Sequence, residues 1–335
     1  MFQMAMSSQH MQLLQSFRKL IPPLLFDGHK GEAGRIGVVG GSEEYTGAPI
    51  FAGMTALRTG ADIVHIFCAK NAAIPIKSFS PDLIVHPLLD SKSFSDDIGK
   101  WLPRLHAVVI GPGLGRDEHI LSNVEELIGI LRKQDKQIPL VIDADGLFLI
   151  TEKPHIINSY ENCILTPNTA EFERLYEKVT GVKSEEIKQE TDKKKLAQKL
   201  AETLRVNILM KGLADTIASP NNQTPIQCAI EGSPRRCGGQ GDLLSGALAI
   251  SYYWVLKNRD KIQYQSSNSE NSPINSEYIN DDSKITPAQI AAYATSTLIR
   301  TSSQTVFKKL GRSMISTDLL KEIGSTFNKL FEKQD

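Results

Sequence analysis

The stretch AVVIGPGLG, residues 107–115, joins a run of β-branched residues to a glycine-rich turn, and it decides the class of fold that we expect. Residues 107–110 predict a short buried strand, and the glycines after it would lie at the carboxyl end of a sheet, where open α/β folds bind ligands. The turn does not complete the dinucleotide-binding pattern G-x-G-x-x-G, because Arg116 occupies the place of the third glycine. The sequence therefore disfavours a nicotinamide-type Rossmann domain.

Short apolar runs alternate with helical patterns along almost the whole chain, which is typical of βα units around a mainly parallel sheet covered on both faces. The expected strands occupy residues 35–39, 62–67, 83–86, 107–110, 140–143, 163–165, 207–211 and 216–218. The expected helices occupy residues 49–59, 118–132, 170–177, 194–203 and 241–256. A further helix would begin after Thr286, with Pro287 in its first turn and Gln289 three residues after the cap, and would run to about residue 301.

The composition excludes several classes of protein. The 335 residues carry 38 Lys and Arg against 38 Asp and Glu, so no overall charge favours a nucleic acid or an anionic membrane surface. The four cysteines lie far apart, without a C-x-x-C pair or a histidine at metal-ligand spacing, and we expect free thiols. No apolar run approaches the length of a membrane span. We expect a cytoplasmic protein. A mitochondrial fraction stays open, because residues 1–20 fit either an amphipathic presequence or a start helix.

The chain is expected to form one catalytic domain over residues 30–335, preceded by an N-terminal helical segment at residues 1–29. Residues 262–284 are dominated by Ser, Asn, Asp and Glu. Such a segment buries too little apolar surface to offset the entropy lost on ordering. It predicts a disordered surface insertion.

A phosphate site is predicted at RRCGGQGD, residues 235–242, which leads directly into the apolar run 243–250. Glycines before a helix let several backbone N–H groups point at one anion, and the helix dipole adds partial positive charge. Asp242 lies in the first turn and would face that anion. It is either a general base toward a hydroxyl that attacks the γ-phosphate or an acid favoured by the helix dipole. This segment alone leaves both roles open.

Two further segments favour the catalytic role. TPNTAEF, residues 166–172, places Asn168 and Glu171 three apart on one helical face. This pair can hold Mg²⁺ through its waters, and a plain helix cap is the alternative. Lys211 to Asp215 is either a hairpin turn or a polar clamp near a nucleotide, and Lys211, emerging from an apolar strand, favours the clamp.

Two other segments carry less information. Asp143 and Asp145 lie at a strand end near the same edge of the sheet, where turn acids that hold backbone N–H groups are the commoner explanation. Residues 40–47 fail as a Walker loop, because no Lys-Ser or Lys-Thr follows the last glycine.

Five motifs occur in a distinctive order: GPGLGR at 111–116, DADG at 143–146, TPNxxEF at 166–172, KGxxD at 211–215 and GGQGD at 238–242. In this order they resemble the ATP-dependent (S)-NAD(P)H-hydrate dehydratase family, a branch of the ribokinase-like superfamily. The resemblance extends from KGEAGR at 30–35 to the final helices. It implies a three-layer α/β/α sandwich with a mainly parallel central sheet and no lid domain.

The resemblance also implies a reaction. ATP would phosphorylate the hydroxyl of hydrated NADH or NADPH, phosphate would then leave, and the intact coenzyme would be regenerated. The implied enzyme is a hydro-lyase with ATP as co-substrate and Mg²⁺ as cofactor. A separate NAD(P)H-hydrate epimerase is the implied functional partner. The preference between the two coenzymes and the formation of a homo-oligomer stay open.

Individual residues match the family's ligand-binding positions. Asp242 matches the residue that touches the reacting hydroxyl, and it is the implied catalytic residue. The positions that match substrate-binding segments are Gly113, Gly115, Asn168, Thr169, Ala170, Glu171, Phe172, Glu173, Arg174 and Asp242, with Gly47 and Ala48 as further candidates. The positions that match ATP-binding stretches are Lys211, Gly212, Leu213, Ala214, Asp215, Gly232, Ser233, Pro234, Arg235, Arg236, Cys237, Gly238, Gly239, Gln240 and Gly241.

Two rival functions remain at this point. A small-molecule kinase of the same fold, acting on a vitamin-precursor alcohol, would use the same anion loop and the same base, but it would leave a stable phosphorylated product. A non-catalytic nucleotide sensor is the other rival. Asp242 argues against the sensor, because a carboxylate aimed at phosphate brings a pure binding protein no advantage.

Overall fold

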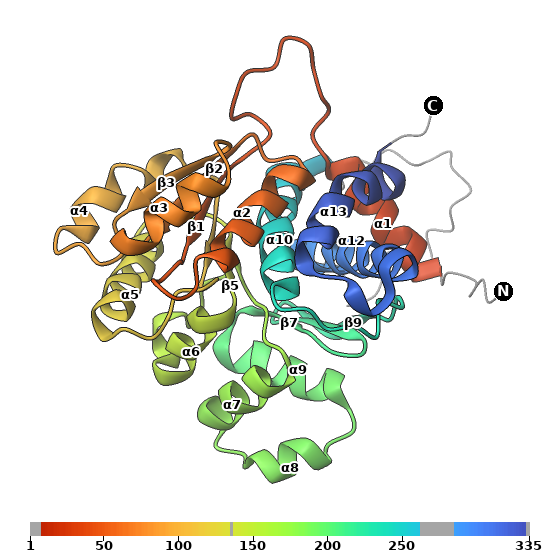
Figure 1. Ribbon diagram of the computed structural model, residues 1–335. Coiled ribbons are helices and arrows are strands. Elements are labelled where there is room, and N and C mark those ends of the chain that lie inside the picture. Colours follow the sequence, from red (N-terminus) through yellow and green to blue (C-terminus); the bar gives the residue numbers. More distant parts are fainter. Residues whose placement is uncertain (1–7, 135–136, 262–284, 333–335) are drawn as a thin grey trace.

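A nine-stranded sheet runs through the centre of the molecule in the computed structural model, which describes residues 8–134, 137–261 and 285–332 (Figure 1). The strand order is β3-β2-β1-β4-β5-β6-β7-β8-β9. Strands β1 to β7 pair in parallel, whereas β8 and β9 pair antiparallel at one edge. The strands are β1 (Arg35–Val39), β2 (Ile63–Cys68), β3 (Leu83–Pro87), β4 (Ala107–Ile110), β5 (Leu140–Ile142), β6 (Cys163–Leu165), β7 (Asn207–Met210), β8 (Asp215–Ser219) and β9 (Asn222–Cys228).

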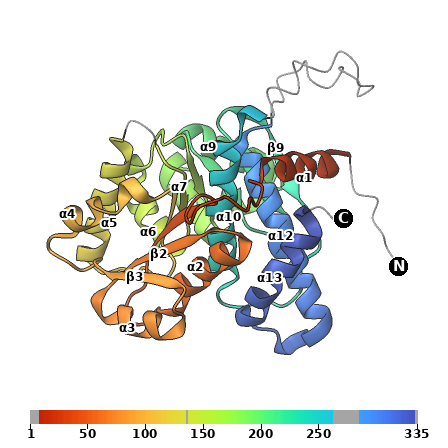
Figure 2. The ribbon, with the colours of Figure 1, turned by 90° about the horizontal axis from the view of Figure 1, so that it is seen from above.

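Helices cover both faces of the sheet, and Figure 2 shows α2 and α3 on one side of the strands and α5 and α6 on the other. The first layer consists of α1 (Ser8–Leu20), α2 (Gly47–Thr59), α3 (Lys70–Phe79), α10 (Gln240–Lys257), α12 (Pro287–Leu310) and α13 (Ser316–Phe331). The second consists of α4 (Phe94–Gly99), α5 (Glu118–Arg132), α6 (Ala144–Glu152), α7 (Thr169–Thr180), α8 (Ser184–Gln189) and α9 (Lys193–Leu204). This is the three-layer sandwich predicted from the sequence.

The strands supply alternate residues to two hydrophobic cores, one on each face of the sheet. In β4, Ala107 and Val109 belong to the core under α2 and α10, and Val108 and Ile110 belong to the core under α5 and α6. All four side chains are fully buried. A strand that is apolar at every position is the pattern expected of a parallel sheet covered on both sides.

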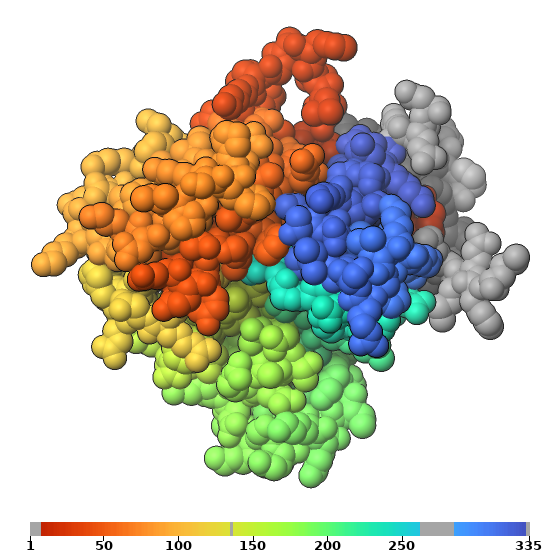
Figure 3. Space-filling model, in the orientation of Figure 1, coloured from red at the N-terminus to blue at the C-terminus, as the bar shows by residue number. Residues whose placement is uncertain are grey.

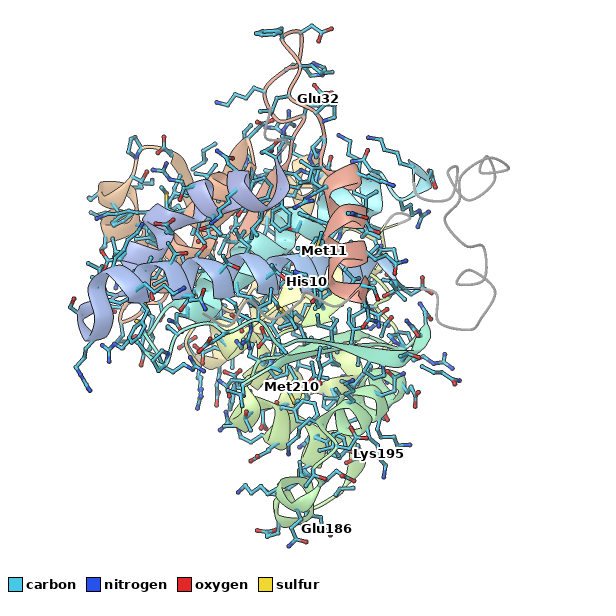
Figure 4. The ribbon with its side chains drawn as sticks, turned by 90° about the vertical axis from the view of Figure 1, so that its right-hand side faces the viewer. His10, Met11, Glu32, Glu186, Lys195 and Met210 are labelled. Atoms are coloured by element: carbon cyan, nitrogen blue, oxygen red, sulfur yellow. The ribbon has the colours of Figure 1, made fainter. Side chains whose placement is uncertain are left out.

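Helix α1 packs onto the C-terminal helices. Its residues Leu13 and Phe17 are buried in the same core as α10 and α12. Figure 4 shows α1 lying across α12, where His10 Nδ1 lies 2.6 Å from the Tyr293 hydroxyl. Residues 23–30 are exposed and project from the body before the chain returns to β1 (Figure 3). Among the described residues, every helix falls short of the combined length and apolarity that crossing a lipid bilayer requires.

The predicted element boundaries agree with the structure to within a few residues, except that α12 continues to Leu310, well beyond the predicted residue 301. The sequence reasoning missed β9 and the helices α3, α4, α6, α8 and α13. Strand β9 carries Pro225 and several polar residues, which suit the outer edge of a sheet but do not look like a strand in the sequence. The predicted insertion at 262–284 lies outside the described residues.

Helices α2 and α10 touch through their backbones, and this contact requires Gly246. A Cβ atom at this position would lie 1.9 Å from the carbonyl oxygen of Ala52. The close approach fixes where α10 lies over the sheet, and therefore where its first turn lies.

Gly246→Ala should destabilise the protein by about 1–3 kcal/mol, because the added methyl group must push α2 and α10 apart. The matched control is Gly129→Ala in α5, where an added Cβ meets nothing within 4 Å. That change should stabilise the protein by about 0.5–1 kcal/mol, since alanine loses less backbone entropy in a helix. Thermal melts of both variants test this, and equal melting temperatures would contradict the packing described.

Candidate active site

The order of the strands reverses beside β1, and this places a topological switch point at the carboxyl ends of β1 and β4. The chain runs outward from β1 to β2 and β3, and then returns to the other side of β1 with β4. Ligands in open α/β sheets bind at such a switch point. The loop after β1 and the predicted loop 111–115 meet there, because the backbone N–H groups of Gly41 and Ser42 both donate to the carbonyl oxygen of Gly113, at 3.0 and 2.7 Å.

Only glycine fits at position 113. Its φ is +61°, and a Cβ atom there would lie 2.3 Å from the carbonyl oxygen of Tyr45 and 3.2 Å from the Cβ of Ala48. The predicted substrate residue Gly113 therefore lies beside Ala48 at the start of α2. The predicted Gly115 is tied to the next loop along the sheet, since its N–H donates to Asp145 Oδ2 at 3.0 Å. Asp145 is thus the turn acid that the sequence favoured.

A buried ion pair joins two further strand ends. Lys211, directly after β7, places its Nζ 2.7 Å from Oδ1 of Asp143, directly after β5. The Asp143 side chain is 1% exposed and the Lys211 side chain 20%. Burial opposes the charge of Lys211, but Asp143 and Glu171 outweigh it and raise the pKa of the ammonium group. The sequence favoured Asp143 as a turn acid that holds backbone N–H groups. This prediction was wrong, because the Asp143 side chain pairs with Lys211 and caps no backbone N–H group of α6.

Asp242 lies above this ion pair in the first turn of α10. A Cβ on the preceding Gly241 would lie 3.2 Å from Lys211 Nζ and 3.4 Å from Asp143 Oδ2, so the helix begins almost in contact with the pair. Burial, together with the charge of Asp143 and against the opposing charge of Lys211, raises the pKa of Asp242 to about 8. A carboxyl group with this pKa exchanges its proton near neutral pH, as a general base must.

Asn168 and Glu171 form a capping box at the start of α7. The Asn168 side chain accepts from the Glu171 N–H at 3.0 Å, and Glu171 Oε2 accepts from the Asn168 N–H at 2.8 Å. The sequence had left a helix cap as the alternative to a magnesium pair, and the structure shows the cap. Glu171 nevertheless lies close enough to act electrostatically on both Lys211 and Asp242. Burial raises its own pKa, against the lowering effect of Lys211.

The rest of the predicted substrate segment, residues 168–174, is divided between core and site. Phe172 is buried in the core under α6 and α7. Glu173 faces α8, where its carboxylate lies 3.9 Å from Lys188 Nζ. The segment therefore contributes its first turn to the site, while the side chains of Phe172 and Glu173 hold the helix in place.

The two predicted ATP-binding stretches are held by the C-terminal helices. In residues 232–241, the Ser233 hydroxyl lies 2.8 Å from that of Ser303 in α12, and the Gly238 carbonyl accepts from Ser316 in α13 at 2.6 Å. Residues 211–215 are held by Arg300 of α12, whose Nη2 lies 2.6 Å from Asp215 Oδ1. Sequence reasoning missed Arg300, because its partners lie 70 to 88 residues earlier in the chain and no local motif marks it.

The family model described as NAD(P)H-hydrate dehydratase matches residues 36–324, which contain every loop of this site. The chain belongs to the NAD(P)H-hydrate dehydratase family. A protein from Mus musculus named ATP-dependent (S)-NAD(P)H-hydrate dehydratase is 46% identical over 321 residues, covering 95% of this chain and 85% of the mouse protein. A Danio rerio protein of the same name is 45% identical over 317 residues, covering 94% of this chain and 88% of its own.

Solved structures agree with the fold of an NAD(P)H-hydrate dehydratase. A ribokinase-like superfamily protein from Enterococcus faecalis is similar with a TM-score of 0.72 at 20% identity, covering 96% of this chain and 95% of that one. The ADP/ATP-dependent NAD(P)H-hydrate dehydratase from Bacillus subtilis, co-crystallised with ATP/Mg²⁺, gives a TM-score of 0.65 at 18% identity, covering 95% and 97%. At these identities the likeness establishes the ribokinase-like fold.

Asp242→Asn should change the dependence of stability on pH. Burial raises the pKa of Asp242 from 3.8 to about 8, so between these pH values the folded state holds the proton more tightly than the unfolded chain. The carboxyl group therefore makes the free energy of unfolding fall as the pH rises through this window. The amide cannot ionise, and its melting temperature relative to the wild type should increase between about pH 5 and pH 8.5. A difference that stays constant across thermal melts at the two pH values would contradict the raised pKa.

Proposed function

We propose that the chain is an ATP-dependent (S)-NAD(P)H-hydrate dehydratase, a lyase that regenerates NADH and NADPH from their hydrated forms with release of ADP and phosphate. One observation carries the chemistry: Asp242 lies in the first turn of a glycine-preceded helix that begins beside the Lys211–Asp143 ion pair, and both charges of the pair act on its carboxyl group. This arrangement places a base of near-neutral pKa where a helix N-terminus attracts phosphate. Membership of the family supplies the substrate.

In the proposed complex, ATP lies along residues 211–215 and 232–241, with its phosphates toward the start of α10. The hydrated nicotinamide ring lies at the switch point, beside Gly113 and Gly115. Both loops converge on the cluster of Asp143, Lys211 and Asp242. The two ligands therefore meet where the general base lies, as an in-line transfer of a phosphoryl group requires.

The proposed reaction has two stages. Asp242 accepts the proton of the hydroxyl group on the hydrated ring as its oxygen attacks the γ-phosphorus, and ADP leaves. Electrons from the ring nitrogen then expel phosphate together with that oxygen, and loss of a proton from the neighbouring carbon restores the double bond. Phosphate is a far better leaving group than hydroxide, so a kinase-like fold performs a net dehydration.

ATP is proposed to enter as its Mg²⁺ complex. The described residues contain no group of three or more His, Cys, Asp or Glu side chains that could hold a metal ion. Asn168 and Glu171 already share a capping box. These observations fit an ion that is held mainly by phosphate oxygens and water, with Glu171 as a carboxylate that can accept from that water. When bound, the ion would neutralise charge on the triphosphate.

The wider setting of the enzyme follows from its substrate. An enzyme that consumes only the S form of the hydrate needs a separate epimerase to make the other form available, and we propose that activity as its functional partner. We also propose a reducing compartment, the cytoplasm, because Cys68, Cys163, Cys228 and Cys237 are all free thiols.

Turnover should require both the nucleotide and Mg²⁺, because Lys211, the one lysine among the described residues that acts on Asp242, cannot balance a triphosphate. The test is regeneration of the NADH absorbance band from hydrated NADH with ATP, in the presence of Mg²⁺ or of excess chelator. Activity should disappear with chelator and return when Mg²⁺ is restored in excess. Full turnover in excess chelator would show that the dependence on metal is wrong.

Asp242→Asn should lower kcat by about 10²–10⁴-fold while ATP binds as well as before or slightly better. The amide keeps the size of the side chain, but it cannot accept the proton and no longer repels phosphate. The rise of kcat/KM through about pH 8, which the pKa of this base predicts, should also disappear.

The matched control for Asp242→Asn is Glu118→Gln, which removes an acid from the first turn of α5. If the role of Asp242 were only to complement the helix dipole, both variants would lose a few tenths of a kcal/mol in stability and little rate. Steady-state turnover and calorimetric titration with ATP distinguish the two roles. Near-normal kcat in Asp242→Asn would rule out the general base.

A further inference from the structure

Arg300, on the buried side of α12, uses every hydrogen-bond donor of its guanidinium group. Its Nε donates to Asp215 Oδ2 at 2.8 Å, and its Nη2 donates to Asp215 Oδ1 at 2.6 Å and to the Gly212 carbonyl at 2.8 Å. Its Nη1 donates to the carbonyl oxygens of Leu213 and Ile230, at 2.8 and 3.0 Å. A guanidinium group has five N–H donors, and all five are used here.

This arrangement cannot be made by another side chain. The planar fork reaches a carboxylate with two parallel bonds and three carbonyl oxygens at the same time. The ammonium group of a lysine has only three donors around a single point. Because no donor of Arg300 remains, the residue cannot also bind a phosphate group, and any effect that it has on a nucleotide must act through the backbone that it holds.

Arg300 holds the first proposed ATP-binding stretch and the segment that leads into the second. Gly212, Leu213 and Asp215 lie in the first stretch, and Ile230 lies two residues before the second. At the middle of the first stretch Leu213 is 92% exposed, so its side chain does not anchor the stretch to the body. One turn further along α12, Ser303 bonds Ser233 of the second stretch at 2.8 Å. A single face of one helix therefore holds both stretches.

We propose that Arg300 is a positioning residue that sets the affinity for ATP by fixing residues 212–215 and 230–233 relative to each other. This inference rests on the proposed location of ATP along these two stretches. In the absence of the five hydrogen bonds, residues 212–215 would sample other conformations, and only the fraction in the binding conformation would accept the nucleotide. The apparent dissociation constant rises in inverse proportion to that fraction.

The test is Arg300→Lys, which keeps the positive charge but loses the planar fork. The KM for ATP should rise about 10- to 100-fold, the range expected when hydrogen bonds to a charged group are lost. The kcat at saturating ATP and the KM for the hydrate should stay within about threefold, because the base and the switch-point loops are untouched. The matched control is Arg132→Lys at the end of α5, where Arg132 Nη1 donates to the Ile156 carbonyl at 2.9 Å. It removes another bond from an arginine to a loop carbonyl, and it should leave the KM for ATP unchanged.

A second variant keeps the test valid if Arg300→Lys does not fold. Asp215→Asn preserves the shape of the partner and removes its charge, so it should raise the KM for ATP in the same direction. If both variants fold, their effects on the KM should be clearly non-additive in the double variant, since both break one interaction. Protection against thermal unfolding by ATP supplies an affinity measurement that does not depend on turnover.

Each outcome decides the inference. A raised KM for ATP with weaker thermal protection by ATP, in Arg300→Lys but not in Arg132→Lys, supports it. A lower melting temperature with unchanged ATP affinity means that Arg300 is only structural and overturns it. Loss of kcat at unchanged ATP affinity also overturns it. If the wild type regenerates no NADH with ATP, the proposed function fails instead, and thermal protection by ATP still tests the role of Arg300.

Discussion

The ion pair between Lys211 and Asp143 is the interaction on which the site depends. It joins the carboxyl ends of β7 and β5, which lie 68 residues apart in the chain, and α10 begins directly above it. Removing one partner of such a buried pair leaves an uncompensated charge and costs about 3–5 kcal/mol. The pair therefore couples the position of the central strands to the position of Asp242. Every other element of the site is arranged around this contact.

The position of Asp242 carries a cost in stability. Burial raises the pKa of its carboxyl group most; the charges of Asp143, Asp145 and Glu171 add to this and Lys211 opposes it, so the ionised form is disfavoured in the folded protein. A carboxyl group with a raised pKa contributes nothing to stability at pH values above that pKa. The first turn of α10, and Asp242 with it, is instead held in place by the close contact of α2 and α10. A proton affinity shifted to near neutrality is what general-base catalysis requires. The proposed role as general base would account for a carboxyl group kept at this cost.

The sequence predicted the parallel sheet and the glycine loops at its carboxyl end, because β-branched runs, glycines and helix caps act locally along the chain. It also indicated that Lys211 and Asp143 lie at the same edge of the sheet as Asp242, since each ends a predicted strand. Their direct pairing could not be foreseen, because it depends on the order of strands in the sheet. Arg300 was missed for a related reason. Four of its five hydrogen bonds go to residues 85–88 positions earlier in the chain, and the fifth goes to a residue 70 positions earlier. Three of the acceptors are backbone carbonyls, which carry no sequence signal. Strand β9 was missed because an edge strand tolerates proline and polar residues.

If the hydroxyl group of the hydrate is phosphorylated before it leaves, as we propose, its oxygen must leave with the phosphate. Hydrated NADH carrying ¹⁸O in that hydroxyl group would be turned over with unlabelled ATP, and the released phosphate analysed by mass spectrometry. We predict one ¹⁸O atom in each phosphate, because the second stage breaks the bond between the ring carbon and that oxygen. Label found in water, with unlabelled phosphate, would mean that hydroxide leaves directly and that Asp242 is not a base toward phosphoryl transfer.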